Sequence, residues 1–258
     1  MTAEILDKQS KAPFNLEDFL REVKATAPLV RTLGDLMPVL YAPESVGSLS
    51  SSLPLYYVHW DVARDNDRPS LMEKGLRYDV TVMPPLVLGE EYVKTIGHDN
   101  LPYTTAGHIK EIFEVLEGEA RFLVQEYRGE EVVNVSLVTA GQGSVFFAPE
   151  NYGVVMINPS IRRLVVRSLS SRNLIHTYTR FIGLGGGAYF LLTHARAVKN
   201  KNYGVVPELR IVSAETLQSV ERESGLLKSV VRNPERFMFL KRPGPEAKLE
   251  GFSDEYMH

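Results

Sequence analysis

The sequence predicts an all-β protein, a barrel or a sandwich, with helical extensions at both ends. From residue 54 onward, short runs rich in Val, Tyr, Phe, Ile and Thr follow one another, separated by Gly, Pro and Asn. This series does not alternate with helical segments, as the strands of an α/β protein would. The first and last parts of the chain show helical spacing instead. Many short strands in series are typical of a barrel or sandwich.

The chain length favours one domain with extensions. Its 258 residues lie near the upper end for a single domain, and the apolar fraction of 44% is enough for a substantial core. We expect an N-terminal helical arm and linker over residues 1–50, a β-barrel over 51–210, and a C-terminal helix and tail over 211–258.

The N-terminal arm has helix signals. Asn15 is suited to cap a helix over residues 16–26, where apolar residues recur at helical spacing until Pro28. A second short helix is expected near residues 29–36. The following "APESVGSLSSSLP" is rich in Ser, Gly and Pro and predicts a loop.

The central region contains the expected strands. They lie within residues 55–63, 76–84, 111–127, 132–149, 153–160, 162–170, 174–183 and 188–195. Helical spacing returns over residues 213–227, and the polar, turn-rich segment from Leu240 predicts a loose tail.

Composition excludes several classes of partner and site. The 29 basic and 32 acidic residues are mixed along the chain, so no basic face is available for nucleic acid. Without cysteine, a metal would need His, carboxylate or water as ligands. The N-terminus has no signal-peptide pattern, and no apolar run reaches bilayer length. We expect a soluble, cytoplasmic protein without a membrane partner.

Two glycine turns indicate where a pocket forms. "EVLEGEARFLV" predicts a strand, a tight turn at Gly118 and a second strand, and "TAGQGSVFFAP" repeats the arrangement. In a small barrel this brings the strand of Glu111 beside the one that follows Pro149, so that inward side chains of both converge.

Several motifs together resemble one family. "RTLGDLMPVLYAPES", "YDVTVMPP", "TIGHDN", "EIFEVLEGEA", "AGQGSVFFAPENYGVVMIN", "KNYGVVPE" and "VRNPERFMF" occur in the order found in the cupin-type glucose-6-phosphate isomerases of archaea and some bacteria. The resemblance spans residues 31–239. It implies a cupin double-stranded β-helix (jelly-roll) barrel, a homodimer, and interconversion of glucose 6-phosphate and fructose 6-phosphate in glycolysis and gluconeogenesis.

The resemblance also implies a divalent metal, such as Fe, Mn, Zn or Ni, but the ligand set is incomplete. That family holds its metal through a Gly-His-x-His pair, a Glu on the next strand and a later His. His98 and Glu111 match, whereas Asn100 and Val154 stand at the other two positions. His108 would complete the site beside Glu111 only if the intervening backbone is irregular, because strand positions three apart point to opposite faces.

For the other histidines, a role as ligand or catalytic group competes with an ordinary structural role. For His59, His176 and His194, a structural histidine is the favoured interpretation.

Substrate contacts also follow from the resemblance. It assigns sugar-phosphate binding to Thr81, Thr95, Gly97 and Tyr203, with Lys201 where the family has a His. Hydroxyls and a glycine N–H are suitable donors to phosphate oxygens, and a lysine, Lys94 or Lys201, adds charge.

Two functions from different classes follow. The first is an aldose–ketose isomerase in which Glu111 is the base and His98 polarises the carbonyl. The alternative is a cupin that has lost its metal and catalysis and serves as a sugar-phosphate-binding or assembly protein. An isomerase or epimerase for another sugar is a third reading, because fold does not fix function.

Overall fold

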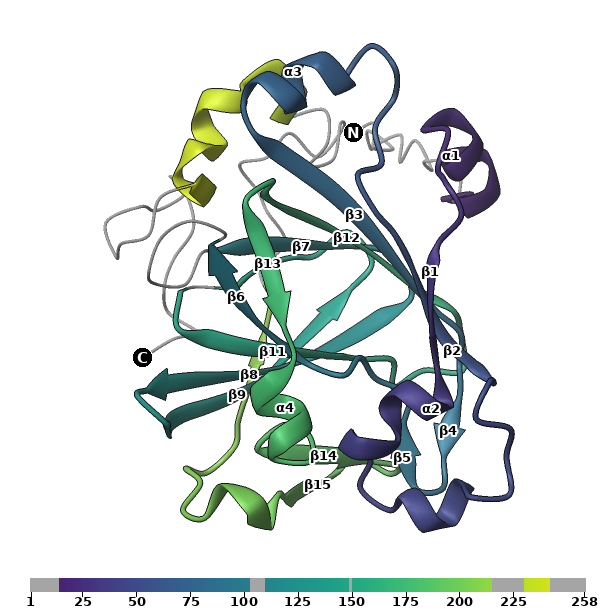
Figure 1. Cartoon of the computed structure of the whole chain (residues 1–258), viewed down its shortest axis with the longest axis vertical. Coiled ribbons are helices and arrows are strands. Elements are labelled where there is room, and N and C mark those ends of the chain that lie inside the picture. The colour runs from purple at the N-terminus through teal and green to yellow at the C-terminus, as the bar shows by residue number, and fades with distance from the viewer. Residues whose placement is uncertain (1–13, 103–109, 149, 215–229, 242–258) are drawn as a thin grey trace, which may run out of the picture.

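The computed structural model describes residues 14–102, 110–148, 150–214 and 230–241. Two six-stranded sheets and one four-stranded sheet make up its β structure (Figure 1). Sheet 1 has the order β1 (Leu29–Thr32), β2 (Pro54–His59), β3 (Leu76–Met83), β12 (Leu164–Ser171), β7 (Glu111–Glu117), β10 (Val145–Ala148). Sheet 2 has the order β13 (Leu174–Thr177), β6 (His98–Pro102), β11 (Tyr152–Ile157), β8 (Glu119–Arg128), β9 (Glu131–Gly141), β16 (Arg210–Ser213).

The remaining elements lie around these two sheets. Sheet 3 has the order β15 (Arg196–Lys199), β14 (Tyr189–Leu192), β5 (Glu91–Tyr92), β4 (Val87–Leu88). The α-helices are α1 (Leu16–Glu22), α2 (Leu33–Leu36), α3 (Arg68–Glu73) and α4 (Thr179–Gly183). The 3₁₀ helices are η1 (Met37–Val39), η2 (Pro43–Val46), η3 (Lys201–Tyr203) and η4 (Pro234–Lys241). Among the described residues, no helix is long and apolar enough to cross a membrane.

The inner faces of sheets 1 and 2 form one apolar core. At its centre Phe113 and Phe146 of sheet 1 meet Phe122 of sheet 2, with ring centroids 5.0 to 5.9 Å apart. Strand pairing in both sheets is antiparallel except between β9 and β16. The architecture confirms the all-β jelly-roll of the cupin type that the sequence predicts.

Both outer faces of this pair of sheets are covered as well. Residues of α1, α3 and η4 pack on the outside of sheet 1, and Figure 1 shows α3 beside the yellow C-terminal segment. Phe181 of α4 and residues of β14 pack on the outside of sheet 2. Central strands are therefore buried on both sides, and every residue of β11 and β12 is buried. Arg167, the charged residue among them, is paired with Glu114 of β7.

The N-terminal arm differs in part from the prediction. Asn15 caps α1 as expected, since its side chain accepts hydrogen bonds from the backbone N–H groups of Glu17 and Asp18. The helix ends at Glu22 rather than at residue 26. Of the short helix expected near residues 29–36, only the second half forms, as α2, because residues 29–32 pair with β2 as strand β1. Tertiary pairing overrides the local helical spacing there.

The expected strands occur with one correction. Residues 174–183 divide into β13 and α4, so only the first half of that run is a strand. The predicted C-terminal helix and most of the tail fall on residues 215–229 and 242–258, outside the described residues.

The turn between β7 and β8 requires glycine and gives a first prediction. Gly118 has φ +84°, and a Cβ there would lie 2.5 Å from the carbonyl oxygen of Arg163. Gly118→Ala should lower the free energy of unfolding by the strain of a left-handed alanine, ~1–2 kcal/mol, plus a packing cost of about 1–3 kcal/mol. Urea denaturation measures the loss.

Gly129→Ala is the matched control for that turn. Gly129 also has positive φ, +63°, but a Cβ there would meet nothing within 4 Å. It should cost only the backbone strain. Equal losses in the two variants would mean that the contact with Arg163 is unimportant.

Candidate functional site

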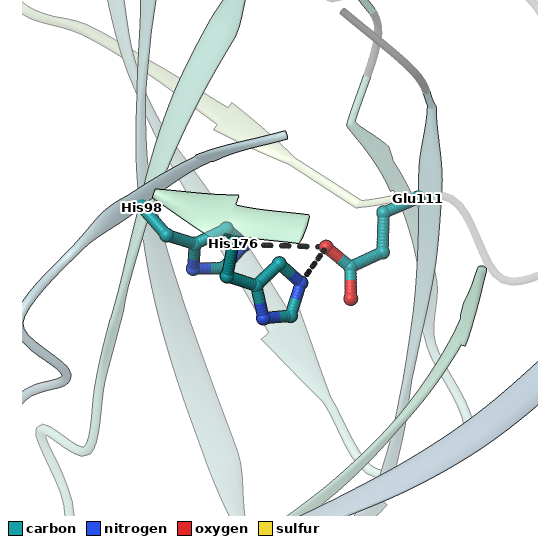
Figure 2. Close-up of side chains that lie close together, drawn as sticks. All are labelled: His98, Glu111 and His176. Carbon is teal, nitrogen blue, oxygen red and sulfur yellow. Dashed lines mark hydrogen bonds and ion pairs between the residues drawn. The ribbon is translucent and has the colours of Figure 1, made fainter. Parts of the chain in front are cut away.

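Three side chains that can bind a metal meet in the interior between the two large sheets. Glu111 comes from β7 in sheet 1, and His98 and His176 come from β6 and β13 in sheet 2. Figure 2 shows both imidazoles directed at the same carboxylate oxygen, with Nε2 of His98 at 3.2 Å and Nε2 of His176 at 3.4 Å from Oε2 of Glu111. One ligand atom of each residue lies within 4.8 Å of the others. Their spacing suits a single ion.

Strand pairing explains how His176 enters the cluster. His98 and Asn100 are two apart on β6 and therefore share a face. β13 pairs with β6 so that His176 lies opposite Asn100. The two imidazoles are thus diagonal neighbours on adjacent strands, with ring centroids 4.0 Å apart. The cross-strand partner of Asn100 supplies the imidazole that position 100 itself lacks.

The protonation states favour ligand binding. Glu111 is fully buried, which acts to raise its pKa, but hydrogen bonding and charge from His176 and His98 hold that pKa well below its usual range. Burial, together with the neighbouring His98, lowers the pKa of His176. At neutral pH the carboxylate is therefore ionised, and the lowered pKa of His176 favours loss of its ring proton, as metal coordination requires.

Several buried polar atoms at the cluster have no hydrogen-bond partner among the described residues. They are Oε1 of Glu111 and Oδ1 of Asn100, while Nε2 of His176 has the 3.4 Å contact with Oε2 of Glu111. The Nδ2 group of Asn100 donates to Oε2 of Glu111 at 3.1 Å. Buried lone pairs without partners are costly, and a divalent cation would use them. Two imidazoles and one carboxylate form a donor set that proteins use for catalytic zinc and non-haem iron, with further positions open. The residues present fit a metal.

The cluster faces a cavity with mixed walls. Apolar and aromatic side chains of both sheets form most of its lining: Leu29, Tyr56, Val58, Trp60, Phe113, Val154, Met156 and Tyr178. The polar lining besides the cluster consists of Arg31, Asp79, Thr81, Thr95, Gly97 and Ser168. A few convergent polar groups in an apolar pocket are typical of a small-molecule site.

The sequence predicts that the strands carrying Glu111 and Val154 lie side by side. The structure shows that they do not. β7 pairs with β10 and β12 in sheet 1, whereas β11 belongs to sheet 2. Glu111 and Val154 nevertheless both line the cavity, because the two sheets face each other across it. The inward side chains converge because their two sheets face each other, and not because their strands are neighbours in one sheet.

Three of the predicted substrate residues lie at this cavity. Thr81, Thr95 and Gly97 all line it. The hydroxyl of Thr95 accepts a hydrogen bond from the backbone N–H of Met156 at 3.0 Å, so its own proton is available to a ligand. Gly97 has φ +90°, and a Cβ there would lie 2.4 Å from the ring of Phe181.

The other predicted substrate residues lie elsewhere. Tyr203 is on η3 outside sheet 2, and its hydroxyl donates to the carbonyl of Gly186 at 2.8 Å. Lys201, on the same turn, is exposed. Lys94 is buried and donates to the carbonyl of Val39 at 2.6 Å. None of these three lines the cavity. His108 lies outside the described residues.

Sequence reasoning passed over three residues that the structure places at the cavity: Arg31, Asp79 and His176. His176 was read as structural because no spacing in the sequence links it to His98. The strand "LIHT", which contains His176, pairs with the strand that begins in "GHDN". This pairing would have identified His176, but it is seen only in the order of the strands in the sheet.

Solved structures with similarity to the chain are distant. A vicilin from Capsicum annuum has 12% identity and a TM-score of 0.35 over 48% of this chain and 31% of its own. Peruvianin-I, a cysteine peptidase from Thevetia peruviana latex, has 17% identity and a TM-score of 0.37 over 48% and 66%. A Cupin_2 domain from an XRE family regulator of Enterobacter cloacae has 13% identity and a TM-score of 0.29 over 45% and 94%. The chain thus spans less than a third of the vicilin.

The sequence itself matches a family. No curated protein sequence matches the chain significantly. The sequence model described as "Glucose-6-phosphate isomerase (GPI)" matches residues 30–208, more than half of the chain, and this range includes all three residues of the metal-type cluster. The chain belongs to the glucose-6-phosphate isomerase (GPI) family.

Proposed function

We propose that the protein is a metal-dependent aldose–ketose isomerase that interconverts glucose 6-phosphate and fructose 6-phosphate. The observation that carries the proposal is the cluster of His98, Glu111 and His176, which faces a cavity also lined by Thr81 and Thr95. Family membership supports the reaction class. The donor set supports Fe, Mn, Zn or Ni as the metal.

The chain's own residues divide the work along the cavity. A divalent ion held by the cluster would stabilise the negative charge that develops on the sugar oxygens during isomerisation. Arg31 is the only Lys or Arg side chain among the described residues of the lining. Its nearest carboxylate, Asp35, is 3.9 Å away, and its side chain is 21% exposed. The guanidinium also lies over the ring of Tyr178, 5.2 Å from its centroid, and with no closer carboxylate in the described part of the chain to neutralise its charge it suits the phosphate of the substrate.

The alternative is a sugar-phosphate-binding or assembly protein without a metal. It is favoured by Asn100 and Val154, which stand where the family resemblance places histidines. Against it stands His176, which restores a second imidazole from the adjacent strand. Metal binding and turnover separate the two functions.

The metal site gives the first test of this proposal. Zn²⁺ or Mn²⁺ added to dialysed wild-type protein should raise the melting temperature, since an ion at 100 times its Kd stabilises the native state by about 2.7 kcal/mol. His176→Ala should weaken the apparent affinity at least ~10-fold, because it removes one of three ligands. His194→Ala removes an exposed histidine and should leave the affinity unchanged. Equal affinity in wild type and His176→Ala would contradict the site.

Turnover gives the second test. Metal-loaded wild type should isomerise glucose 6-phosphate, and metal-free protein should not. Glu111→Gln should lose bound metal and lower kcat/KM at least ~100-fold, because the ion contributes several kcal/mol to charge stabilisation. Glu131→Gln, an exposed carboxylate on β9, is the control. Binding of 6-phosphogluconate to well-folded wild type without metal or turnover would instead support the binding protein.

A further inference from the structure

Isomerisation by an enediol route needs a group that removes a proton from one carbon and returns it to the next. Glu111 is poorly suited if it is a metal ligand. One of its oxygens already meets both imidazoles and the amide of Asn100. We propose that Asp79 is the catalytic base that carries this proton, while Glu111 holds the metal. This inference rests on the proposed isomerase function.

Asp79 shares the cavity with the cluster but stands apart from it. It lies on β3 opposite Ser168 of β12, and Ser168 lies opposite Phe113 of β7. Glu111 is two residues from Phe113 and therefore on the same face. Asp79 and Glu111 are separated by one intervening strand, a lateral distance of roughly 10 Å between backbones. All four residues line the cavity. The two carboxylates therefore line one cavity from separate strands, with Glu111 in the cluster and Asp79 outside it.

The carboxylate of Asp79 is fixed in orientation. Its side chain is 3% exposed. Oδ1 accepts a hydrogen bond from the backbone N–H of Asp61 at 2.9 Å, and Oδ2 accepts one from Nε of Arg77 at 2.9 Å. An ionised carboxylate has about four acceptor positions, so each oxygen keeps one for a substrate proton. A restrained rotamer in a dry site is what a positioned base requires.

Other residues hold the donor from Asp61 in place. Asp61 has φ +51°, a conformation that costs a non-glycine residue free energy. Nη1 of Arg172 donates to its Oδ1 at 2.6 Å, and Nη1 of Arg68 donates to its Oδ2 at 3.1 Å. These two arginine side chains hold the Asp61 carboxylate and so stabilise the strained backbone at this residue. The backbone N–H of Asp61 therefore points at Asp79 rather than at solvent.

The charges around Asp79 suit proton transfer at neutral pH. Burial raises the pKa of Asp79 to about 6; the Arg77 guanidinium and the Asp61 N–H oppose this effect, and the Glu111 carboxylate adds to it. On the flanking strand β12, the facing residue is the neutral Ser168. Asp79 is therefore mostly ionised at pH 7, yet basic enough to accept a proton from carbon.

The step balances without a co-reactant. The Asp79 carboxylate takes the proton from C2 of the open-chain aldose, and the C–H electron pair forms the C1–C2 double bond while the carbonyl pair moves onto O1. The proton on O2 transfers to O1, and the O2 electron pair forms the ketose carbonyl at C2. The electron pair of the C1–C2 double bond then takes the proton back from Asp79 and forms the new C1–H bond. The aldose becomes the ketose with no net change in electrons.

A purely structural role is the competing interpretation. Arg77 packs over the ring of Trp60 at 5.0 Å, and that ring lies 5.9 Å from the ring of His176. Asp79 would then only anchor Arg77 and, through it, the wall of the cavity. This role predicts effects on folding or KM and none on the exchange of substrate hydrogen with solvent.

The decisive experiment measures solvent deuterium in the product. Metal-loaded wild type converting glucose 6-phosphate in D₂O should place deuterium at C1 of the ketose, read by NMR, and its kcat/KM should fall below about pH 6 as Asp79 is protonated. Asp79→Asn keeps an acceptor for Asp61 and should lower kcat at least ~100-fold, with bound metal and KM near wild type. The variant loses the ion pair with Arg77, so it should remain folded with a lower melting temperature. Asp65→Asn, an exposed aspartate near this loop, is the control.

The outcomes separate this inference from the function on which it rests. Wild type that does not isomerise rejects both. Wild type that isomerises without deuterium uptake, or Asp79→Asn that retains kcat, rejects only the role of Asp79. If Asp79→Asn is unfolded, Asp79→Gly with added formate replaces it. Rescue of turnover by formate supports a base at this position, and no rescue in folded protein overturns it.

Discussion

The buried carboxylate of Glu111 joins the two large sheets at one point. It projects from sheet 1 and meets His98, Asn100 and His176 of sheet 2 across the interior. An ionised carboxylate that is withdrawn from water is costly unless charges or hydrogen bonds compensate it. The surrounding imidazoles and amide supply that compensation. Because they come from two neighbouring strands, the arrangement requires the β6–β13 register to be correct.

The register also places residues of two different strands at one point of the inner face. A ligand at position 100 and a ligand at position 176 occupy adjacent places on the same inner face, because the two residues pair across β6 and β13. The side chain of Asn100 remains in contact with Glu111. A motif written along one strand does not include a histidine that a neighbouring strand contributes. Whether a side chain can act as a ligand depends on its position in the folded structure rather than on its position in the sequence.

The sequence was informative where local rules decide the structure. The cap at Asn15, the glycine turn at Gly118 and the series of β-strands follow from residue type and spacing, and the structure confirms them. The helix expected near residues 29–36 forms only over its second half, because pairing of residues 29–32 with β2 outweighs helical spacing. Local signals do not reveal which distant strand will be a neighbour.

The same limit applied to the site. His98 and Glu111, which the motif predicts as ligands, lie in the cluster, and Thr81, Thr95 and Gly97, predicted to bind substrate, line the cavity. Residues brought in by strand order alone were missed: Arg31, Asp79 and His176. Tyr203 and Lys201 were assigned by position in a motif, but η3 carries them to the outside of sheet 2. Inward or outward placement of a turn cannot be read from its residues.

X-ray absorption at the zinc edge of the zinc-loaded protein tests the central claim most directly. The account predicts a first shell of nitrogen and oxygen ligands that includes two imidazoles, with one imidazole remaining after His176→Ala. A wild-type spectrum with one imidazole, or one unchanged by the loss of His176, would contradict the proposal that the metal is held by residues of three strands.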